Sequence, residues 1–388
     1  MTLKIYKSER LAIGMVLCAV GTVGTVVGMS FPLLTFLLER EGFSASLIGI
    51  NGAMSSLGIF VVGLYTARIL ARHGAFLLII AATTIGAGSL IALPLIDHAI
   101  GWFVLRFSLA LGMGFIWLLS ESWLNMLSSD INRGRIIGLY AVFFSGGFAL
   151  GPLIVTLTGS QGPMPFFIAA AVTVAGSLPM LVLANRGATG GPKPTPKLAL
   201  LRLAPFVFLF AFAGGLFETT AFSLLPIYTL GEGLSEAASL YALSAFSVGG
   251  IALQYPLGRY ADSSGRPALM MLSAAGVLIG ILIMPFVVDQ TYVLMTLLFV
   301  WGGMVFGLYT SGLIMLGDKY GAENLVAANA LFIICYVVGA MFGPALSGGA
   351  MDMWPDHGFV SFLMVMAVLL LGAVVIRSFR RTPPANGS

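Results

Sequence analysis

The feature that most constrains this chain is a succession of long apolar runs separated by short polar breaks. A helix that crosses the core of a bilayer needs roughly 20 mostly apolar residues. Strands of a membrane barrel would alternate apolar and polar residues over about ten positions, and these runs are longer and continuously apolar. The pattern therefore predicts an all-α polytopic membrane protein with twelve transmembrane helices, at 11–38, 44–67, 75–96, 100–127, 136–158, 163–184, 204–230, 236–258, 267–288, 291–316, 324–348 and 357–378.

The composition supports a lipid environment. Of the 388 residues, 59% are apolar and only 9% are charged, and the mean hydropathy is +1.01. Soluble domains contain about 25% charged residues, so this chain could not cover a water-exposed surface. The first apolar run lacks a signal-type cleavage site followed by a polar chain, and we interpret it as a retained helix. The lipid bilayer is thus the expected partner of the whole molecule.

The basic residues indicate an orientation. When both termini are placed in the cytoplasm, every Lys and Arg except Arg40 and Arg106 falls in a cytoplasmic segment. Cytoplasmic loops of membrane proteins are enriched in these residues. We therefore expect a multi-pass protein of a bacterial inner membrane with cytoplasmic termini. The formal net charge of +4 then reflects this topology, and no binding of nucleic acid is expected.

An internal repeat divides the chain into two halves. The segment 185–202 is rich in Gly and Pro, which favours a solvated linker between domains at 1–184 and 203–388. Glu41-Gly42-Phe43-Ser44 recurs 191 positions later as Glu232-Gly233-Leu234-Ser235, and Gly74 corresponds to Gly265 at the same offset. Such a repeat predicts two pseudo-symmetric bundles of six helices each.

A polar loop after the span 236–258 carries a recognisable motif. It reads Gly258-Arg259-Tyr260-Ala261-Asp262-Ser263-Ser264-Gly265-Arg266 and resembles the G-x-x-x-D-x-x-G-R loop of the major facilitator superfamily. The resemblance implies a cytoplasmic gating loop in which Asp262 accepts hydrogen bonds from helix N-termini. The corresponding loop of the first half keeps Arg72 and Gly74 but has Ala in place of the leading Gly and the Asp.

Two further motifs are similar to patterns of the same superfamily. Arg106 begins a segment that resembles R-x-x-x-G-x-G, with Ala110 in the first Gly position. A glycine-proline pattern typical of antiporter branches occurs in the fifth predicted span and again in the eleventh, and it implies bent, closely packed helices. Its residues are Gly147, Gly151, Pro152, Gly343 and Pro344.

The resemblance to this superfamily extends over the whole chain, and one segment also suggests a subgroup. Glu121-Ser122-Trp123-Leu124-Asn125, followed by Asn132-Arg133-Gly134-Arg135, resembles the YcaD-like group of bacterial carriers. The superfamily resemblance implies the major facilitator fold and transport by alternating access. It also implies a central cavity between the halves, lined by the first, fourth, seventh and tenth helices.

Charged residues inside predicted spans are candidates for coupling transport to protons. Glu218 and Glu121 are the acidic residues that lie within spans and away from their ends. Arg106 is the basic residue within a span and could be an electrostatic partner or a substrate contact. A carboxyl group in the apolar midplane could gain and lose a proton as the cavity changes sides. Alternative interpretations remain: a permanently neutral Glu218, a packing role for Glu121 at the cytoplasmic gate, and an Arg106 near the outer headgroups.

Other polar, aromatic and sulfur-containing side chains could line the cavity. Soft and polarizable linings suit amphipathic solutes, although such residues can equally be packing residues. The shortage of buried cations argues against an organophosphate or dicarboxylate substrate. The candidate lining residues are Met29, Trp117, Asn125, Phe217, Trp301 and Tyr309.

These observations predict a secondary transporter that exports a small amphipathic solute in exchange for protons, acts as a monomer and uses the proton gradient without a cofactor. The alternatives are an uptake symporter or uniporter, a lipid flippase or scramblase, and a non-transporting membrane sensor. No enzyme and no metal site are expected, because His73, His98 and His357 lie in different loops. ATP-driven transport is not expected either, since the chain has no P-loop motif.

Overall fold

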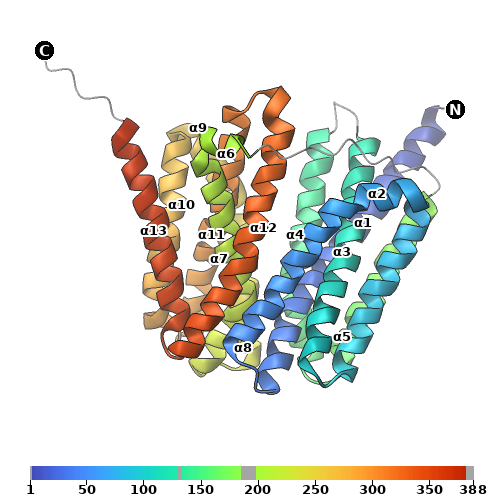
Figure 1. The fold of residues 1–388 in the computed structure, drawn as a ribbon. Helices are drawn as coiled ribbons and strands as arrows, with labels where there is room; N and C mark the ends of the chain where they lie inside the picture. Colours follow the sequence, from blue (N-terminus) through green and yellow to red (C-terminus); the bar gives the residue numbers. More distant parts are fainter. Residues whose placement is uncertain (1, 129–132, 185–197, 382–388) are drawn as a thin grey trace, which may run out of the picture. The chain divides into compact units, whose positions relative to one another are not determined.

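The computed structural model describes residues 2–128, 133–184 and 198–381, and it is built from helices (Figure 1). Eleven helical segments of this described part are long and apolar enough to cross a membrane. One of them, α2 (Ala45–Ala92), covers most of both the second and the third predicted span. The twelve predicted spans are therefore all helical, and the predicted fold class is confirmed.

The first compact unit comprises residues up to Gly42 and the segment Asn51–Lys193. Within it α1 packs against the third, fourth and fifth α-helices. The elements of this part of the chain are α1 (Thr2–Arg40), α2, the short 3-10 helix η1 (Leu93–Leu95), α3 (Ala99–Leu127), α4 (Arg133–Thr158) and α5 (Met164–Leu183).

The second compact unit comprises Phe43–Ile50 and the chain from Pro194 onward. Its closest helix pairs are α7 with α12, α8 with α11 and α10 with α11. The helices are α6 (Leu200–Leu203), α7 (Pro205–Gly231), α8 (Glu236–Ala252), α9 (Gln254–Ser264), α10 (Arg266–Val287), α11 (Thr291–Lys319), α12 (Ala322–Met353) and α13 (Gly358–Arg381). The domain boundaries expected from the sequence stay a prediction, and residues 185–197 of the expected linker lie outside the described part.

The internal repeat is also seen in the backbone conformation of four glycines. Gly74 (φ 75°, ψ 168°) interrupts α2, and Gly265 (φ 86°, ψ 156°) separates α9 from α10. Gly42 and Gly233 also have positive φ values, 76° and 89°. Glycine adopts this region without the steric penalty that a Cβ atom brings. Each pair has the offset of 191 residues, so the repeated sequence motifs mark the same turns in both halves.

Glycines also set the closest helix contacts. In the first unit, a Cβ atom on Gly147 of α4 would overlap the carbonyl of Gly21 on α1, and one on Gly151 would meet the backbone at Gly28. Close approach of this kind is a common way to pack helices in lipid, where no hydrophobic force drives them together. Pro152 lies inside the same helix, one residue after Gly151.

The second unit repeats this arrangement between α7 and α12. A Cβ atom on Gly339 would overlap the carbonyl of Phe212, and one on Gly343 would meet that of Leu216. Pro344 again lies within the helix, directly after the second glycine. In each half, the glycine-proline motif therefore lies at a close helix contact, or seam, between α1 and α4 in the first unit and between α7 and α12 in the second.

The eighth predicted span, 236–258, is divided where one continuous helix was expected. α8 ends at Ala252 and α9 begins at Gln254. The Gln254 side chain donates to the Gly250 carbonyl at 2.7 Å and accepts a hydrogen bond from the hydroxyl of Thr310 on α11. These side-chain bonds satisfy polar groups beside the break, as the apolar surroundings of a membrane helix require.

Candidate functional site

The seam between α7 and α12 positions the predicted coupling residue Glu218. Glu218 lies near the middle of α7, one turn after Gly215. A Cβ atom on Gly215 would overlap the carbonyl of Tyr336 on α12, so the two backbones are in direct contact at this level. The absence of a side chain at Gly215 therefore brings the Glu218 carboxyl within reach of α12.

Glu218 has a hydrogen-bond partner that the sequence interpretation did not single out. The Tyr336 hydroxyl donates to the Glu218 carboxylate. The Tyr336 ring also meets that of Tyr309 on α11 edge to face, with 5.4 Å between the ring centres and 85° between the planes. All three side chains are half-buried. Three helices thus contribute one polar group each to a cluster, Glu218–Tyr336–Tyr309, in the apolar interior of the second unit.

Arg106 is fully enclosed within the first unit. Its side chain is 1% exposed, and its Nη1 donates to the Ser30 carbonyl of α1 at 2.8 Å. The guanidinium carbon lies 4.4 Å from the centre of the Phe31 ring, a cation–π geometry. This burial shows that the guanidinium lies among protein groups, and its depth in the membrane stays a prediction. The guanidinium is stabilised by a carbonyl dipole and an aromatic face.

Glu121 lies two turns before the end of α3 and is exposed. It belongs to the first unit, as Arg106 does, whereas Glu218 belongs to the second. Asn125 is in the last turn of the same helix, and its side chain lies outside the described residues. The predicted polar pair of Glu121 and Asn125 therefore stays a prediction.

Three of the predicted cavity residues are buried in the structure. Met29, Phe217 and Trp301 are at most 1% exposed. The Trp301 indole nitrogen donates to the Val277 carbonyl at 3.1 Å, and its ring centre lies 5.2 Å from that of Phe246. The role of these three residues as a cavity lining stays a prediction.

Trp117 and Tyr309, the other two described candidates, are half-buried. Trp117 stacks on Phe144 of α4 with 5.6 Å between the ring centres, and its indole nitrogen donates to the Tyr140 hydroxyl. Phe144 in turn lies 6.4 Å from Phe148 along the same helix. The first unit therefore has a row of aromatic rings between α3 and α4 in which Trp117 keeps part of its surface free.

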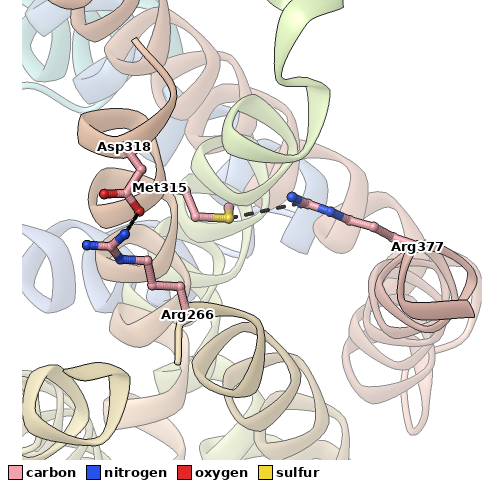
Figure 2. A network of polar contacts seen from close by, with 4 residues as sticks. All are labelled: Arg266, Met315, Asp318 and Arg377. Atoms are coloured by element: carbon pink, nitrogen blue, oxygen red, sulfur yellow. Dashed lines mark hydrogen bonds and ion pairs between the residues drawn. The ribbon is translucent and has the colours of Figure 1, made fainter. Parts of the chain in front are cut away.

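The loop motif of the second unit is held by an ion pair that uses a residue outside the motif. Arg266, at the start of α10, pairs with Asp318 in the last turn of α11, as Figure 2 shows. Beside them, the Arg377 guanidinium of α13 points toward the Met315 sulfur at 4.0 Å (Figure 2). The signal in the sequence was an acidic residue, Asp318, on the side of the molecule where basic residues dominate.

The remaining motif residues lie at the surface of their loops. Asp262 is exposed and lines a shallow hollow of about 410 Å³ together with Arg259, Tyr260 and Ser263. A Cβ atom on Gly258 would meet no neighbour within 4 Å. Arg72 is also exposed, shortly before the break at Gly74. Within the described chain, the carboxylate that anchors this loop region is therefore that of Asp318.

Among the described residues, no group of three or more His, Cys, Asp or Glu side chains could hold a metal ion. The polar groups of the membrane interior are instead single charges with hydrogen-bonding or aromatic neighbours. Such isolated ionisable groups typify substrate and proton pathways in membrane proteins.

Comparison with known proteins agrees with this architecture. The sequence profile of the Major Facilitator Superfamily matches residues 16–244 and 207–388. The uncharacterized MFS-type transporter YfkF of Bacillus subtilis (strain 168) is 26% identical over 371 residues, covering 92% of this chain and 93% of YfkF. The uncharacterized MFS-type transporter YcaD of Escherichia coli O45:K1 is 26% identical over 355 residues, covering 90% and 91%.

Solved structures show the same fold at lower identity. The nucleoside transporter NupG superposes with a TM-score of 0.75 at 15% identity, over 96% of this chain and 97% of NupG. A D-xylose-proton symporter gives 0.72 at 14% identity, over 99% of both chains. The helices, the repeated loop motif and the matching profile lead to one conclusion: this chain is a multi-pass membrane transporter that belongs to the Major Facilitator Superfamily.

Proposed function

We propose that this transporter exports a small amphipathic solute across a bacterial inner membrane in exchange for protons, with Glu218 as the proton carrier. The observation that carries the proposal is the half-buried carboxyl of Glu218 in mid-helix, hydrogen-bonded to Tyr336. A charged group at this depth costs at least about 2.5 kcal/mol unless it is paired or hydrated. A carboxyl that alternates between a neutral and a hydrogen-bonded charged form could therefore couple proton entry to a change of state.

The Tyr336 hydroxyl supports this role because it can serve both forms of the carboxyl group. It donates a hydrogen bond to the carboxylate, and its oxygen can accept one from the protonated acid. Since Tyr336 is on α12 and Glu218 on α7, the strength of this bond depends on how the two helices pack. Protonation of Glu218 would thus act on the α7–α12 contact.

An amphipathic solute fits the half-buried aromatic side chains. Trp117 in the first unit and Tyr309 in the second are each partly exposed. Both side chains join an apolar ring to a polar tip, which suits a solute with an apolar body and polar groups. In this proposal Arg106 contributes a fixed positive charge to the first unit, and Glu121 acts as a polar gate toward the cytoplasm.

The proposed transporter works as a monomer with both termini in the cytoplasm. It uses the proton gradient as its energy source and needs no cofactor, ATP or nucleic acid. A small-molecule solute and the lipid bilayer are then its partners.

Flux measurements in proteoliposomes test the coupling role of Glu218. A panel of amphipathic compounds is screened for transport driven by an imposed pH gradient, and the Glu218→Gln variant is then compared with the wild type. We expect this variant to lose gradient-driven transport and to keep solute exchange without a gradient, because the amide cannot carry a proton. The matched control is Asp289→Asn, which neutralises an exposed acid outside the spans.

Unchanged gradient-driven transport by Glu218→Gln would refute this role. The direction of flux separates export from uptake: accumulation of solute on the acidic side supports exchange against protons, and accumulation on the opposite side supports a symporter. Movement of a fluorescent lipid probe without any soluble substrate would indicate a flippase instead.

A further inference from the structure

A pocket of about 1040 Å³ opens at the end of the second unit where α7 and α12 end and α13 begins. Its lining residues do not include any member of the Glu218–Tyr336–Tyr309 cluster. Its lining contains three acidic residues, Glu232, Asp352 and Asp356, and three ring side chains, Tyr228, Trp354 and His357. Binding pockets for small molecules have volumes of roughly 300–1,000 Å³, so this pocket has room for a whole amphipathic molecule.

The charge at this end of the unit is entirely negative. Besides the three lining acids, Glu236 begins α8 and Asp289 lies in the connection between α10 and α11. Between residues 203 and 376 the basic residues are Arg259, Arg266 and Lys319, which all lie at the far ends of the membrane helices. A surface lined by charges of one sign attracts ligands of the opposite sign and raises their local concentration.

Two of the three lining acids have no ion-pair partner within the described residues. The Asp352 oxygens already accept hydrogen bonds from the backbone nitrogens of Ala45 and Ser46, at 2.8 and 3.1 Å. Glu232 and Asp356 are exposed, and neither has an ion-pair partner in the described part of the chain. Glu232 also follows the C-terminal end of α7, where the partial negative charge of the carbonyls disfavours another anion. A bound cation would relieve that repulsion.

A buried hydroxyl provides an independent indication of a ligand. Tyr228 lines the pocket and is only 4% exposed, and its hydroxyl has no hydrogen-bond partner among the described residues. A buried polar group without a partner costs roughly 1–3 kcal/mol. Stacking on Phe359, with 4.9 Å between the ring centres, fixes the Tyr228 ring in place. The N–H of a ligand could satisfy the phenol oxygen.

These features select an organic cation over a metal ion. The pocket acids do not form a set of three or more side chains that could hold a metal, within the described residues. The exposed Trp354 and the ring of His357, 5.4 Å apart, instead offer aromatic faces to a cation or to an apolar body. We propose that this pocket is a binding site for an amphipathic organic ammonium ion, with Glu232 and Asp356 as counter-ions and the Tyr228 hydroxyl as hydrogen-bond acceptor.

Equilibrium binding to the purified protein in nanodiscs of zwitterionic lipid tests the site without any transport. The probe is 2-phenylethylammonium, and its charge-reversed counterpart is 3-phenylpropionate, which has the same apolar body. We expect the wild type to bind the ammonium ion, and to bind the carboxylate at least about tenfold more weakly, a difference of about 1.4 kcal/mol. Calorimetry measures both affinities.

Variants then assign the binding to this pocket. The double variant Glu232→Gln/Asp356→Asn should weaken binding of the ammonium ion about tenfold or more, and Tyr228→Phe should weaken it by a smaller factor. Asp289→Asn, which removes an exposed acid that does not line the pocket, should leave the affinity unchanged.

Several results would overturn the assignment: equal affinity for the two probes, no binding of the ammonium ion at millimolar concentration, or an unaltered affinity in the double variant. Because the assay uses no pH gradient, its outcome is independent of the role proposed for Glu218. Loss of coupling in Glu218→Gln with intact ammonium binding would separate the two sites.

Discussion

At the scale of single residues, two tyrosine hydroxyls of the second unit have different surroundings. Tyr336 donates to the ionisable carboxyl of Glu218. Tyr320 is 4% exposed and donates to the backbone carbonyl of Leu200 at 2.7 Å, which ties the α11–α12 connection to the short helix α6. Only the first bond involves a group that can change its charge, so we expect the two hydroxyls to serve transport and stability respectively.

Removal of each hydroxyl tests this distinction. Tyr336→Phe should lower gradient-driven flux roughly tenfold, because a hydrogen bond to a charged group contributes about 1.5–3 kcal/mol. Its thermal unfolding temperature should also fall, because the lost hydrogen bond stabilises the folded state, while the ring contact with Tyr309 remains. Tyr320→Phe should lower the unfolding temperature, by a loss of about 1 kcal/mol, and leave flux per folded molecule unchanged. The opposite pattern of flux would contradict the assignment of Tyr336.

At the scale of elements, the contact between α7 and α12 depends on backbone atoms that approach each other without side chains between them. Gly215 and Gly339 lie on opposite sides of this contact, each against a carbonyl of the other helix. Close packing contributes dispersion energy and also sets the distance between Glu218 and Tyr336. Stability and the geometry of the candidate site are therefore linked at this seam.

A single methyl group should be enough to disturb the seam. We expect Gly339→Ala to destabilise the protein by about 1–3 kcal/mol, because the new Cβ atom would overlap the Phe212 carbonyl and force the helices apart. Gly349→Ala in the same helix is the control, since a Cβ atom there would meet nothing within 4 Å. The unfolding temperature of both variants is measured in detergent. Equal unfolding temperatures would contradict a close backbone contact between α7 and α12.

At the scale of the whole molecule, the orientation in the membrane follows from the distribution of basic residues. Ser264, at the end of α9, and Gln290, just before α11, are exposed positions at opposite ends of α10. With cytoplasmic termini, position 264 would face the cytoplasm and position 290 the outside. The pocket beside α7, α12 and α13 would then open outward.

Cysteine labelling measures this orientation directly. In a background that lacks Cys18 and Cys335, a cysteine at position 290 should react with an impermeant maleimide in right-side-out vesicles. A cysteine at position 264 should react only in inverted vesicles. The reversed result would invert the topology and place the proposed ammonium site on the cytoplasmic side.

Much of the architecture could be predicted from the sequence because lipid imposes strict requirements on a chain. Backbone polar groups in the bilayer must be satisfied within the helices, so long apolar runs can only be helices, and all twelve predicted spans are helical. The turns at Gly74 and Gly265, with their positive φ values, could also be predicted from the sequence, since glycine is the residue that adopts such values without strain. Glu218 itself stood out as a carboxyl group in an apolar run.

The surroundings of Glu218 were decided only by the tertiary structure. Tyr336 is 118 positions from Glu218, and no local pattern connects them; the close approach at Gly215 and Gly339 brings them together. The burial of Met29 and Trp301 is likewise a property of the folded molecule, because the composition of an apolar span does not say which of its side chains are enclosed. The lipid bilayer sets the length and the apolar character of each span, and both can be read along the chain. Contacts between helices that are distant in sequence depend on the complementary shapes of their surfaces, which form only in the folded molecule.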